Sequence, residues 1–290
     1  MLMDAPAGAR NNPLAVAPST MTPGLVYGPV SAGKITSGRK FAKLLPLAAN
    51  WPIVALAFLS VAVPQLALLW RPAVGAYATA MMLLALMTLA LRKERLRKLA
   101  LAAAVYPLSL FIAMTLPITG TFDRAAAFYD VLLLFSIAYS LIFALTPPYE
   151  KTLSRKTYLL WLPIMVVVGE ALGGLGYALL RHHYEFTGTV VPLVVGAGVF
   201  AIAEELFFRG LLQRQAAKVM HPAAATAAAS LAYAAAAIGH GTWLPAAFAL
   251  LSGAALSTIF YFKPSVLLTT IANMTMKLTY FGLMWTFVLK

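Results

Sequence analysis

Residues 51–70 read WPIVALAFLSVAVPQLALLW, a run without a single charged side chain. About twenty apolar residues are enough to cross a hydrocarbon core of roughly 30 Å as an α-helix. Similar runs recur almost to the C-terminus, at about 74–91, 99–119, 126–147, 158–180, 189–213, 223–240, 244–262 and 265–287. The sequence therefore predicts an all-α, polytopic transmembrane helix bundle with eight or nine spans.

The composition supports an integral membrane protein. Of the 290 residues, 61% are hydrophobic and only 11% are charged, an apolar share above that of soluble domains. The runs are continuous and rich in Ala and Leu, whereas the strands of a membrane barrel alternate over about ten residues. The chain has no cysteine, which excludes disulfides, iron–sulfur clusters and thiolate zinc sites.

The formal net charge of +13 comes from basic residues that lie between apolar runs and not on one soluble face. We therefore expect membrane lipids and no nucleic acid as partners. A cytoplasmic N-terminus would place most basic segments on the cytoplasmic side, as the positive-inside bias requires. These are the loops RKERLRK (92–98) and EKTLSRK (150–156), the end with Arg209, Arg214 and Lys218, and Lys263. We expect an integral membrane protein in this orientation.

The stretch AIAEELFFRG (201–210) places three ionisable residues inside an apolar run. Each costs roughly 2.5–3.5 kcal/mol near a helix centre, so the group needs partners or a watery cavity. Glu205 and Arg209 are four residues apart in the favourable order for a pair on one helix face. Glu204 points about 100° away and has no local counter-ion, which makes it a candidate general base. The alternative is a structural cluster, in which both acids bond to neighbouring helices.

The motif Glu204-Glu205-x-x-x-Arg209, followed by glycine, resembles the first signature of the type II CAAX prenyl endopeptidase family. The resemblance extends to its bacterial relatives, the CPBP or abortive-infection-like intramembrane proteases, and covers about residues 189–280. In that family F-x-x-x-H follows some thirty to forty residues later, and H-x-x-x-N or H-x-x-x-D lies on another helix.

The second and third motifs match in part. His240 stands where the second-motif histidine belongs, although Ala236 occupies the aromatic position and Tyr233 would have to fill that volume. The third motif has its asparagine, Asn273, but Thr269 replaces its histidine.

The resemblance implies an intramembrane endopeptidase in which Glu204 and His240 activate a water and Asn273 donates to the oxyanion. Its substrate would be a membrane-associated or C-terminally anchored protein, with Glu205, Arg209 and Thr269 as supporting residues. Losing one oxyanion donor costs about 10²–10³ in rate in other hydrolases, and the Thr269 hydroxyl can recover part of this.

Three other uses of these residues remain open. Glu204, Glu205 and His240 would be the ligands of a zinc site, but adjacent glutamates that face different directions make a poor cage, so we expect no cofactor. The departure at Thr269 favours a catalytically impaired family member that acts as a membrane scaffold or immunity protein. A proton-coupled transporter would use Glu170, Glu204 and Lys277.

Two further ionisable residues inside predicted spans are candidates to support the site. Glu170 lies in VVVGEALGG, where it either supports the catalytic residues or forms a structural pair, and the neighbouring glycines favour close helix approach. Lys277 follows Asn273 by four residues on the same helix face and is a candidate counter-ion for Glu170 or Glu205.

The heights of the site residues disagree if every span is a straight α-helix. Glu204 lies about 21 Å above the turn at 219–222 and His240 about 27 Å above it, whereas Asn273 lies roughly 14 Å above Pro264. We therefore expect a kink or a re-entrant start to the alanine-rich span at 223–240.

These observations divide the chain into three regions. Residues 1–48 are rich in Pro, Gly, Ala and Ser without hydrophobic periodicity, and they predict a disordered basic cytoplasmic tail. Residues 49–188 form N-terminal transmembrane helices, and residues 189–290 form a protease-like transmembrane core.

Overall fold

A computed structural model of the protein describes residues 46–118, 121–143, 154–181, 190–238 and 242–288. These residues form helices and no strand, which confirms the predicted all-α fold. Leu44–Lys290 make up one compact unit. The predicted tail at 1–48 lies outside the described residues except for its last three positions, so its disorder stays a prediction.

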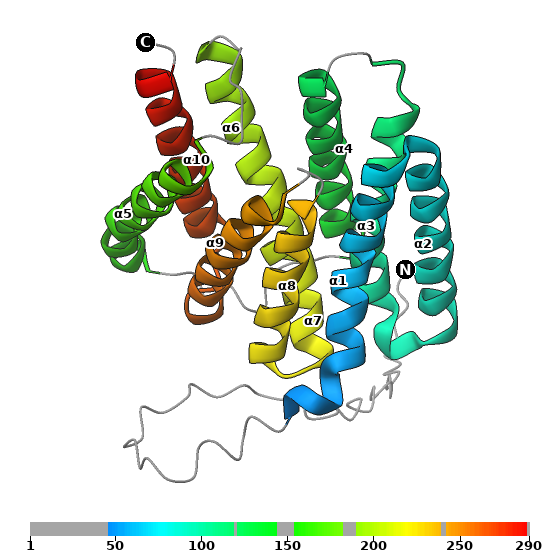
Figure 1. The fold of residues 1–290 in the computed structure, drawn as a ribbon. Helices are drawn as coiled ribbons and strands as arrows, with labels where there is room; N and C mark the ends of the chain where they lie inside the picture. The colour runs from blue at the N-terminus through cyan, green and yellow to red at the C-terminus, as the bar shows by residue number, and fades with distance from the viewer. Residues whose placement is uncertain (1–45, 119–120, 144–153, 182–189, 239–241, 289–290) are drawn as a thin grey trace, which may run out of the picture. The chain divides into compact units, whose positions relative to one another are not determined.

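Figure 1 shows the helices packed side by side as a bundle. They are α1 (Pro46–Trp70), α2 (Pro72–Arg92), α3 (Glu94–Thr115), α4 (Thr121–Ile142), α5 (Arg155–Leu180), α6 (Val190–Glu205), the π-helix η2 (Leu206–Gln213), α7 (Arg214–Val219), α8 (Pro222–Ala236), α9 (Trp243–Phe262) and α10 (Val266–Val288).

Every predicted apolar run corresponds to one helix, or in one case to α6 and η2, which α7 continues. Six helices in the described part of the chain are long and apolar enough to cross a membrane, namely α1, α2, α3, α4, α5 and α9. The protein is therefore an integral membrane protein with a polytopic helical bundle.

The basic stretch at 92–98 is not the loop that the sequence predicts. The helix α2 continues through Arg92 and α3 begins at Glu94, so only Lys93 separates them. Arg, Lys, Glu and Leu are strong helix formers, and long basic side chains reach water from a helix end. The same helix α3 ends at Thr115, one residue before the position preceding Pro117, where proline disfavours helical backbone.

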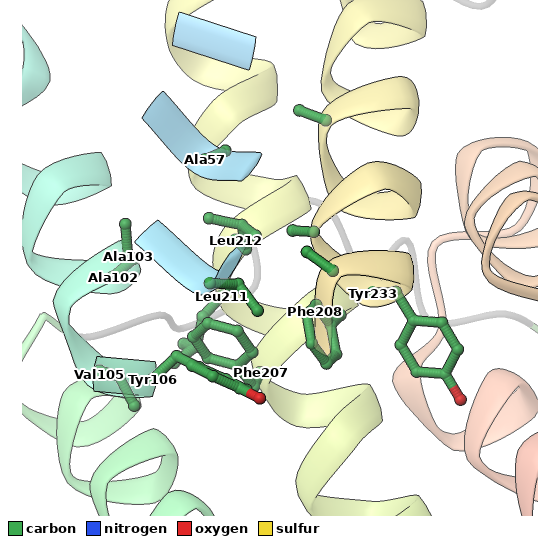
Figure 2. Close-up of a cluster of buried hydrophobic side chains, with 14 of the residues drawn as sticks. Ala57, Ala102, Ala103, Val105, Tyr106, Phe207, Phe208, Leu211, Leu212 and Tyr233 are labelled. Carbon is green, nitrogen blue, oxygen red and sulfur yellow. The ribbon is translucent and has the colours of Figure 1, made fainter. Parts of the chain in front are cut away.

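The core forms around the helical stretch that carries the ionisable residues. Figure 2 shows Phe207, Phe208, Leu211 and Leu212 of η2 packed among small side chains of α1 and α3, with Tyr106 and Tyr233 beside them. Alanines on the neighbouring helices let the backbones approach closely. This packing fixes η2, which directly follows Glu204 and Glu205, in the middle of the bundle.

The predicted difference in height between Glu204 and Asn273 is absent from the structure, whereas the height of His240 is not tested because it lies outside the described residues. The Nδ2 of Asn273 lies 3.0 Å from Oε2 of Glu204, so the two residues share one level. A π-helix bonds residue i to i+5 and places more residues in each turn, so α-helical rise overestimates the height of Glu204. In Figure 1 the lower end of α9 also lies above the lower ends of α7 and α8, which raises the start of α10. The helix α8 starts as a regular α-helix at Pro222.

Two glycines of α5 allow α10 to pack closely against it, in agreement with the predicted close approach. A Cβ added to Gly173 would lie 2.5 Å from the carbonyl oxygen of Met276, and one added to Gly169 would collide with the carbonyl oxygen of Ala272. By contrast, Gly174 has open space where its Cβ would be. The contact matters for the site because α10 carries Asn273.

Candidate functional site

Glu204, at the end of α6, is held by donors from three other helices. Its Oε1 accepts hydrogen bonds from the Tyr129 hydroxyl at 2.9 Å and from Lys277 Nζ at 3.0 Å. Its Oε2 accepts from the Tyr233 hydroxyl and from Asn273 Nδ2, each at 3.0 Å. These donors come from α4, α8 and α10, so the site depends on tertiary packing.

Glu204 has no counter-ion on its own helix, as predicted, but a cation from a distant part of the chain pairs with it in the folded protein. Lys277 forms an ion pair with Glu204 and not with Glu170 or Glu205. The reason is geometric, because Lys277 and Asn273 share one face of α10 and that face meets the end of α6. Glu170 is exposed on α5 and makes no hydrogen bond or ion pair with another described residue.

Glu205 forms the predicted pair with Arg209 within the helix. Its Oε1 accepts from Arg209 NH1 at 2.9 Å and from Asn273 Nδ2 at 2.9 Å. The other terminal nitrogen of Arg209 donates to the carbonyl of Gly253 at 3.2 Å, and the guanidinium lies 4.7 Å from the centre of the Tyr233 ring. Both side chains of the pair are completely buried.

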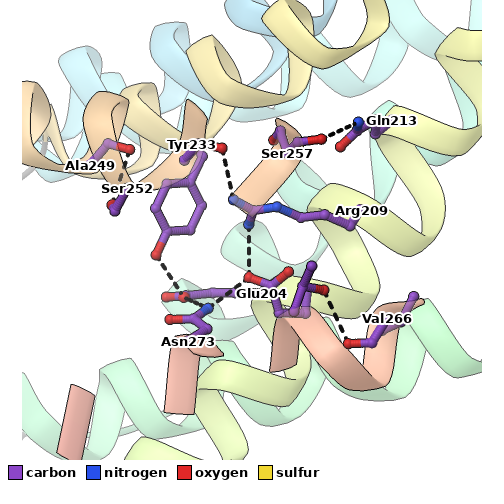
Figure 3. A network of polar contacts seen from close by, with 12 residues as sticks. Glu204, Arg209, Gln213, Tyr233, Ala249, Ser252, Ser257, Val266 and Asn273 are labelled. Carbon is purple, nitrogen blue, oxygen red and sulfur yellow. Dashed lines mark hydrogen bonds and ion pairs between the residues drawn. The ribbon is translucent and has the colours of Figure 1, made fainter. Parts of the chain in front are cut away.

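Asn273 joins the two carboxylates. Figure 3 shows its side chain beside the carboxylate of Glu204, to which the Tyr233 hydroxyl also points. Its amide donates to Glu204 and to Glu205, and the residue is fully buried. The structure thus brings Asn273 to the candidate base, but both of its N–H groups point at carboxylates. Its role as an oxyanion donor stays a prediction.

Thr269 lies one turn from Asn273 on α10 and is also fully buried. Its side chain lies beside Glu205. Its hydroxyl donates to backbone carbonyls of its own helix, Ser265 at 3.4 Å and Val266 at 3.1 Å. The hydroxyl is therefore not directed at Glu204.

His240 lies outside the described residues, so neither its predicted role with Glu204 nor the zinc alternative is tested. Among the residues that the structure does describe, no group of three His, Asp or Glu side chains could hold a metal ion. Glu204 and Glu205 each have a cation partner already.

A cavity of about 390 Å³ opens beside Glu204 and Lys277. Aromatic and aliphatic side chains form most of its wall, including Tyr106, Tyr129, Phe200, Phe208, Tyr233, Phe248, Tyr280 and Phe281. A largely apolar cavity with a few convergent polar groups is typical of a ligand site. This one can hold an apolar segment next to a carboxylate.

Sequence reasoning missed the role of two tyrosines. Tyr233 was expected only to fill the volume of the aromatic position in the second motif, and Tyr129 was not expected in the site at all. The chain contains 12 tyrosines, most of which lie in or near apolar runs. Composition alone does not tell a donor to Glu204 from an interfacial anchor.

Comparison with known proteins agrees with this site. Residues 186–279 match the family model described as Type II CAAX prenyl endopeptidase Rce1-like. The matched segment contains Glu204, Glu205, Asn273 and Lys277, whereas Tyr129 lies outside it. No curated protein and no solved structure matches the chain. The match supports an endopeptidase function of the intramembrane CAAX type. Residues 186–279 are thus similar to the Rce1-like type II CAAX prenyl endopeptidase family, as the sequence motifs predict.

Proposed function

We propose that the protein is an intramembrane endopeptidase that hydrolyses a peptide bond of a membrane-associated or C-terminally anchored protein. One observation carries the proposal: the carboxylate of Glu204 lies at the wall of an apolar cavity, within a segment that matches a protease family. Intramembrane acids are costly and are functional by default.

In the proposed reaction Glu204 takes a proton from a water as the water oxygen bonds to the substrate carbonyl carbon. The proton then passes to the leaving nitrogen as the C–N bond breaks. His240 would share this work with Glu204.

The resting arrangement leaves no free acceptor position on Glu204. A carboxylate has about four lone-pair sites, and Tyr129, Tyr233, Asn273 and Lys277 occupy them. A water can reach the carboxylate only when one donor leaves. We infer that Lys277 is this donor, because it lines the cavity on a flexible stem and its side chain is 18% exposed.

The central experiment measures cleavage of an internally quenched peptide library with apolar C-terminal segments by the purified protein in detergent micelles. Replacing the base by Glu204→Gln keeps the shape of the side chain and should lower kcat/KM by about 10²–10⁴. The matched control is Glu170→Gln, which changes another glutamate inside a membrane helix. It should cleave like the wild type.

Equal thermal midpoints of the two variants would show that both are folded. Cleavage that persists undiminished in Glu204→Gln would refute the assignment of the base.

We propose that the reaction needs no metal. A divalent ion at Glu204 and Glu205 would have to displace Lys277 and Arg209, which already balance both carboxylates. Dialysis against a chelator should leave the cleavage rate unchanged. Loss of activity that zinc restores would instead support the zinc alternative with His240.

The second candidate function is that of a catalytically impaired relative, a membrane scaffold or immunity protein. The Thr269 hydroxyl favours this second function, because it donates hydrogen bonds to carbonyls of its own helix and none to Glu204. Thr269→His separates the two functions. The enzyme proposal expects equal or greater cleavage in this variant, whereas the scaffold proposal expects no cleavage in wild type or variant.

We also propose the predicted orientation, with a cytoplasmic N-terminus in a bacterial inner membrane. The absence of cysteine from the chain makes labelling of single introduced cysteines clean. Arg71→Cys and Lys93→Cys mark opposite ends of α2. An impermeant thiol reagent applied to intact cells should label the first and spare the second, and the reverse pattern would overturn the orientation.

A further inference from the structure

A second cavity, of about 430 Å³, lies where α2 joins α3. Its wall consists of Ile53 of α1, Val219 of α7 and the residues around the junction, namely Arg92, Lys93, Glu94, Arg95 and Leu96. The Arg95 side chain donates to the carbonyl of Val219 at 3.4 Å and so bridges the turn to α7. This cavity shares no lining residue with the cavity beside Glu204.

The wall of this cavity carries an excess of positive charge. Arg92, Lys93 and Arg95 face a single acid, Glu94, and none of the three forms an ion pair with another described residue. More cations lie close by. Burial, followed by the charges of Lys98 and Arg214, lowers the pKa of Lys218, which lies beyond the predicted span. The region therefore attracts an anion.

The surroundings place this cavity at the depth of lipid head groups. Trp51 lies two residues before Ile53 on α1 and is 65% exposed, as is typical of tryptophans at a membrane–water interface. Leu91 immediately precedes Arg92 and is 84% exposed, so an apolar surface adjoins the cations. Figure 1 shows that the turn between α2 and α3 lies at the same end of the bundle as the end of α7.

We propose that this cavity binds the phosphate of an anionic phospholipid, with an acyl chain along the surface of α2 at Leu91. Guanidinium groups match phosphate oxygens in a two-pronged geometry, and Arg92 and Arg95 supply two of them at one cavity. Basic pockets between transmembrane helices recognise phospholipid head groups in this way. The site is separate from the proposed catalytic centre and does not depend on its activity.

The test uses the full chain in detergent, with retained lipid measured by native mass spectrometry. Phosphatidylglycerol is compared with phosphatidylcholine of the same acyl chains. The variant Arg92→Gln/Arg95→Gln removes two cations from the cavity. The control Arg155→Gln/Lys156→Gln removes the same charge from the start of α5, whose residues do not line the cavity.

Wild type and control should retain phosphatidylglycerol in preference to phosphatidylcholine. The cavity variant should retain phosphatidylglycerol about tenfold less well or worse, since each cation near an anionic surface contributes to binding. If that variant is poorly folded without lipid, Lys93→Gln, which changes the one residue between the two helices, should give a smaller loss in the same direction.

Two results would overturn the proposal. Equal loss of phosphatidylglycerol from the cavity variant and the control would show a general effect of charge and no site. A rise of the thermal midpoint with inorganic phosphate as large as that with phosphatidylglycerol would assign the cavity to a soluble phosphate and not to a lipid.

Discussion

The polar cluster around Asn273 contains two pairs of a glutamate and a cation, one on its inner side and one on the side of the cavity. The two pairs lie in different environments. On the inner side, Glu205 pairs with Arg209, and both side chains are 0% exposed. On the cavity side, Glu204 pairs with Lys277, with exposures of 7% and 18%. Asn273 donates to both carboxylates and joins the two sides.

The difference indicates that two adjacent glutamates serve different purposes. The inner pair forms within one helix, and Gly253 and Tyr233 complete the surroundings of its cation. Such a closed pair supports the fold, because neither charge can meet a substrate. The cavity pair is assembled from distant helices around an opening, so its partners can change.

The largest effect on stability is expected from removing the cation of either pair, Arg209 or Lys277. Arg209→Met leaves Glu205 buried without a counter-ion and should lower the free energy of unfolding by about 3–5 kcal/mol. Lys277→Met should cost less, because water in the cavity can solvate Glu204. Unfolding titrations of both variants in one detergent measure the difference.

A double variant provides the control for the inner pair. Glu205→Gln/Arg209→Met removes both charges and should recover part of the stability lost in Arg209→Met, since the isolated buried charge is the main penalty. Equal losses of unfolding free energy in Arg209→Met and Lys277→Met would contradict the proposed difference between the two sides.

A smaller effect is expected from the contact that presses α10 onto α5. Gly173→Ala forces a methyl group against the Met276 carbonyl and should destabilise the protein by about 1–3 kcal/mol. Gly174→Ala, one residue away in open space, should be neutral or stabilising by up to about 1 kcal/mol. Thermal midpoints compare the two variants, and a greater loss in Gly174→Ala would contradict the contact.

The same helix packing decides whether the cavity side keeps its geometry. α10 carries both Asn273 and Lys277, so Gly173→Ala should lower cleavage more than its stability loss alone predicts. An unchanged kcat in a destabilised Gly173→Ala protein would mean that the site tolerates movement of α10.

The sequence predicts the helices well because hydrophobic length is a local property. It fails at 92–98, where a run of charges suggests a loop although the same residues are good helix formers. It also fails to predict the π-helix that follows Glu205, because an extra residue per turn is selected by packing around the helix and not by its own composition.

The residues of the site also divide into those that the sequence can identify and those that it cannot. Glu204, Glu205 and Asn273 can be identified because polar residues inside an apolar run are rare and costly. The partner of Lys277 cannot be predicted from spacing, since three glutamates in the spans compete and only the packing of α10 selects Glu204. Tyr129 gives no local signal, because its hydroxyl meets Glu204 from a helix 75 residues away in sequence.

The smallest effect on stability is expected from the two tyrosines on the cavity side. Their variants also test whether the cavity side serves catalysis or only the fold. Tyr129→Phe and Tyr233→Phe each remove one of four hydrogen bonds to Glu204, so each should cost only about 0.5–1.5 kcal/mol of stability. If the cavity side serves catalysis, kcat should fall in both variants by more than this loss explains. Steady-state kinetics beside thermal midpoints would show it. A fall in stability with kcat unchanged would instead show that both hydroxyls have a structural role. The cavity side as a whole would then support the fold and not catalysis.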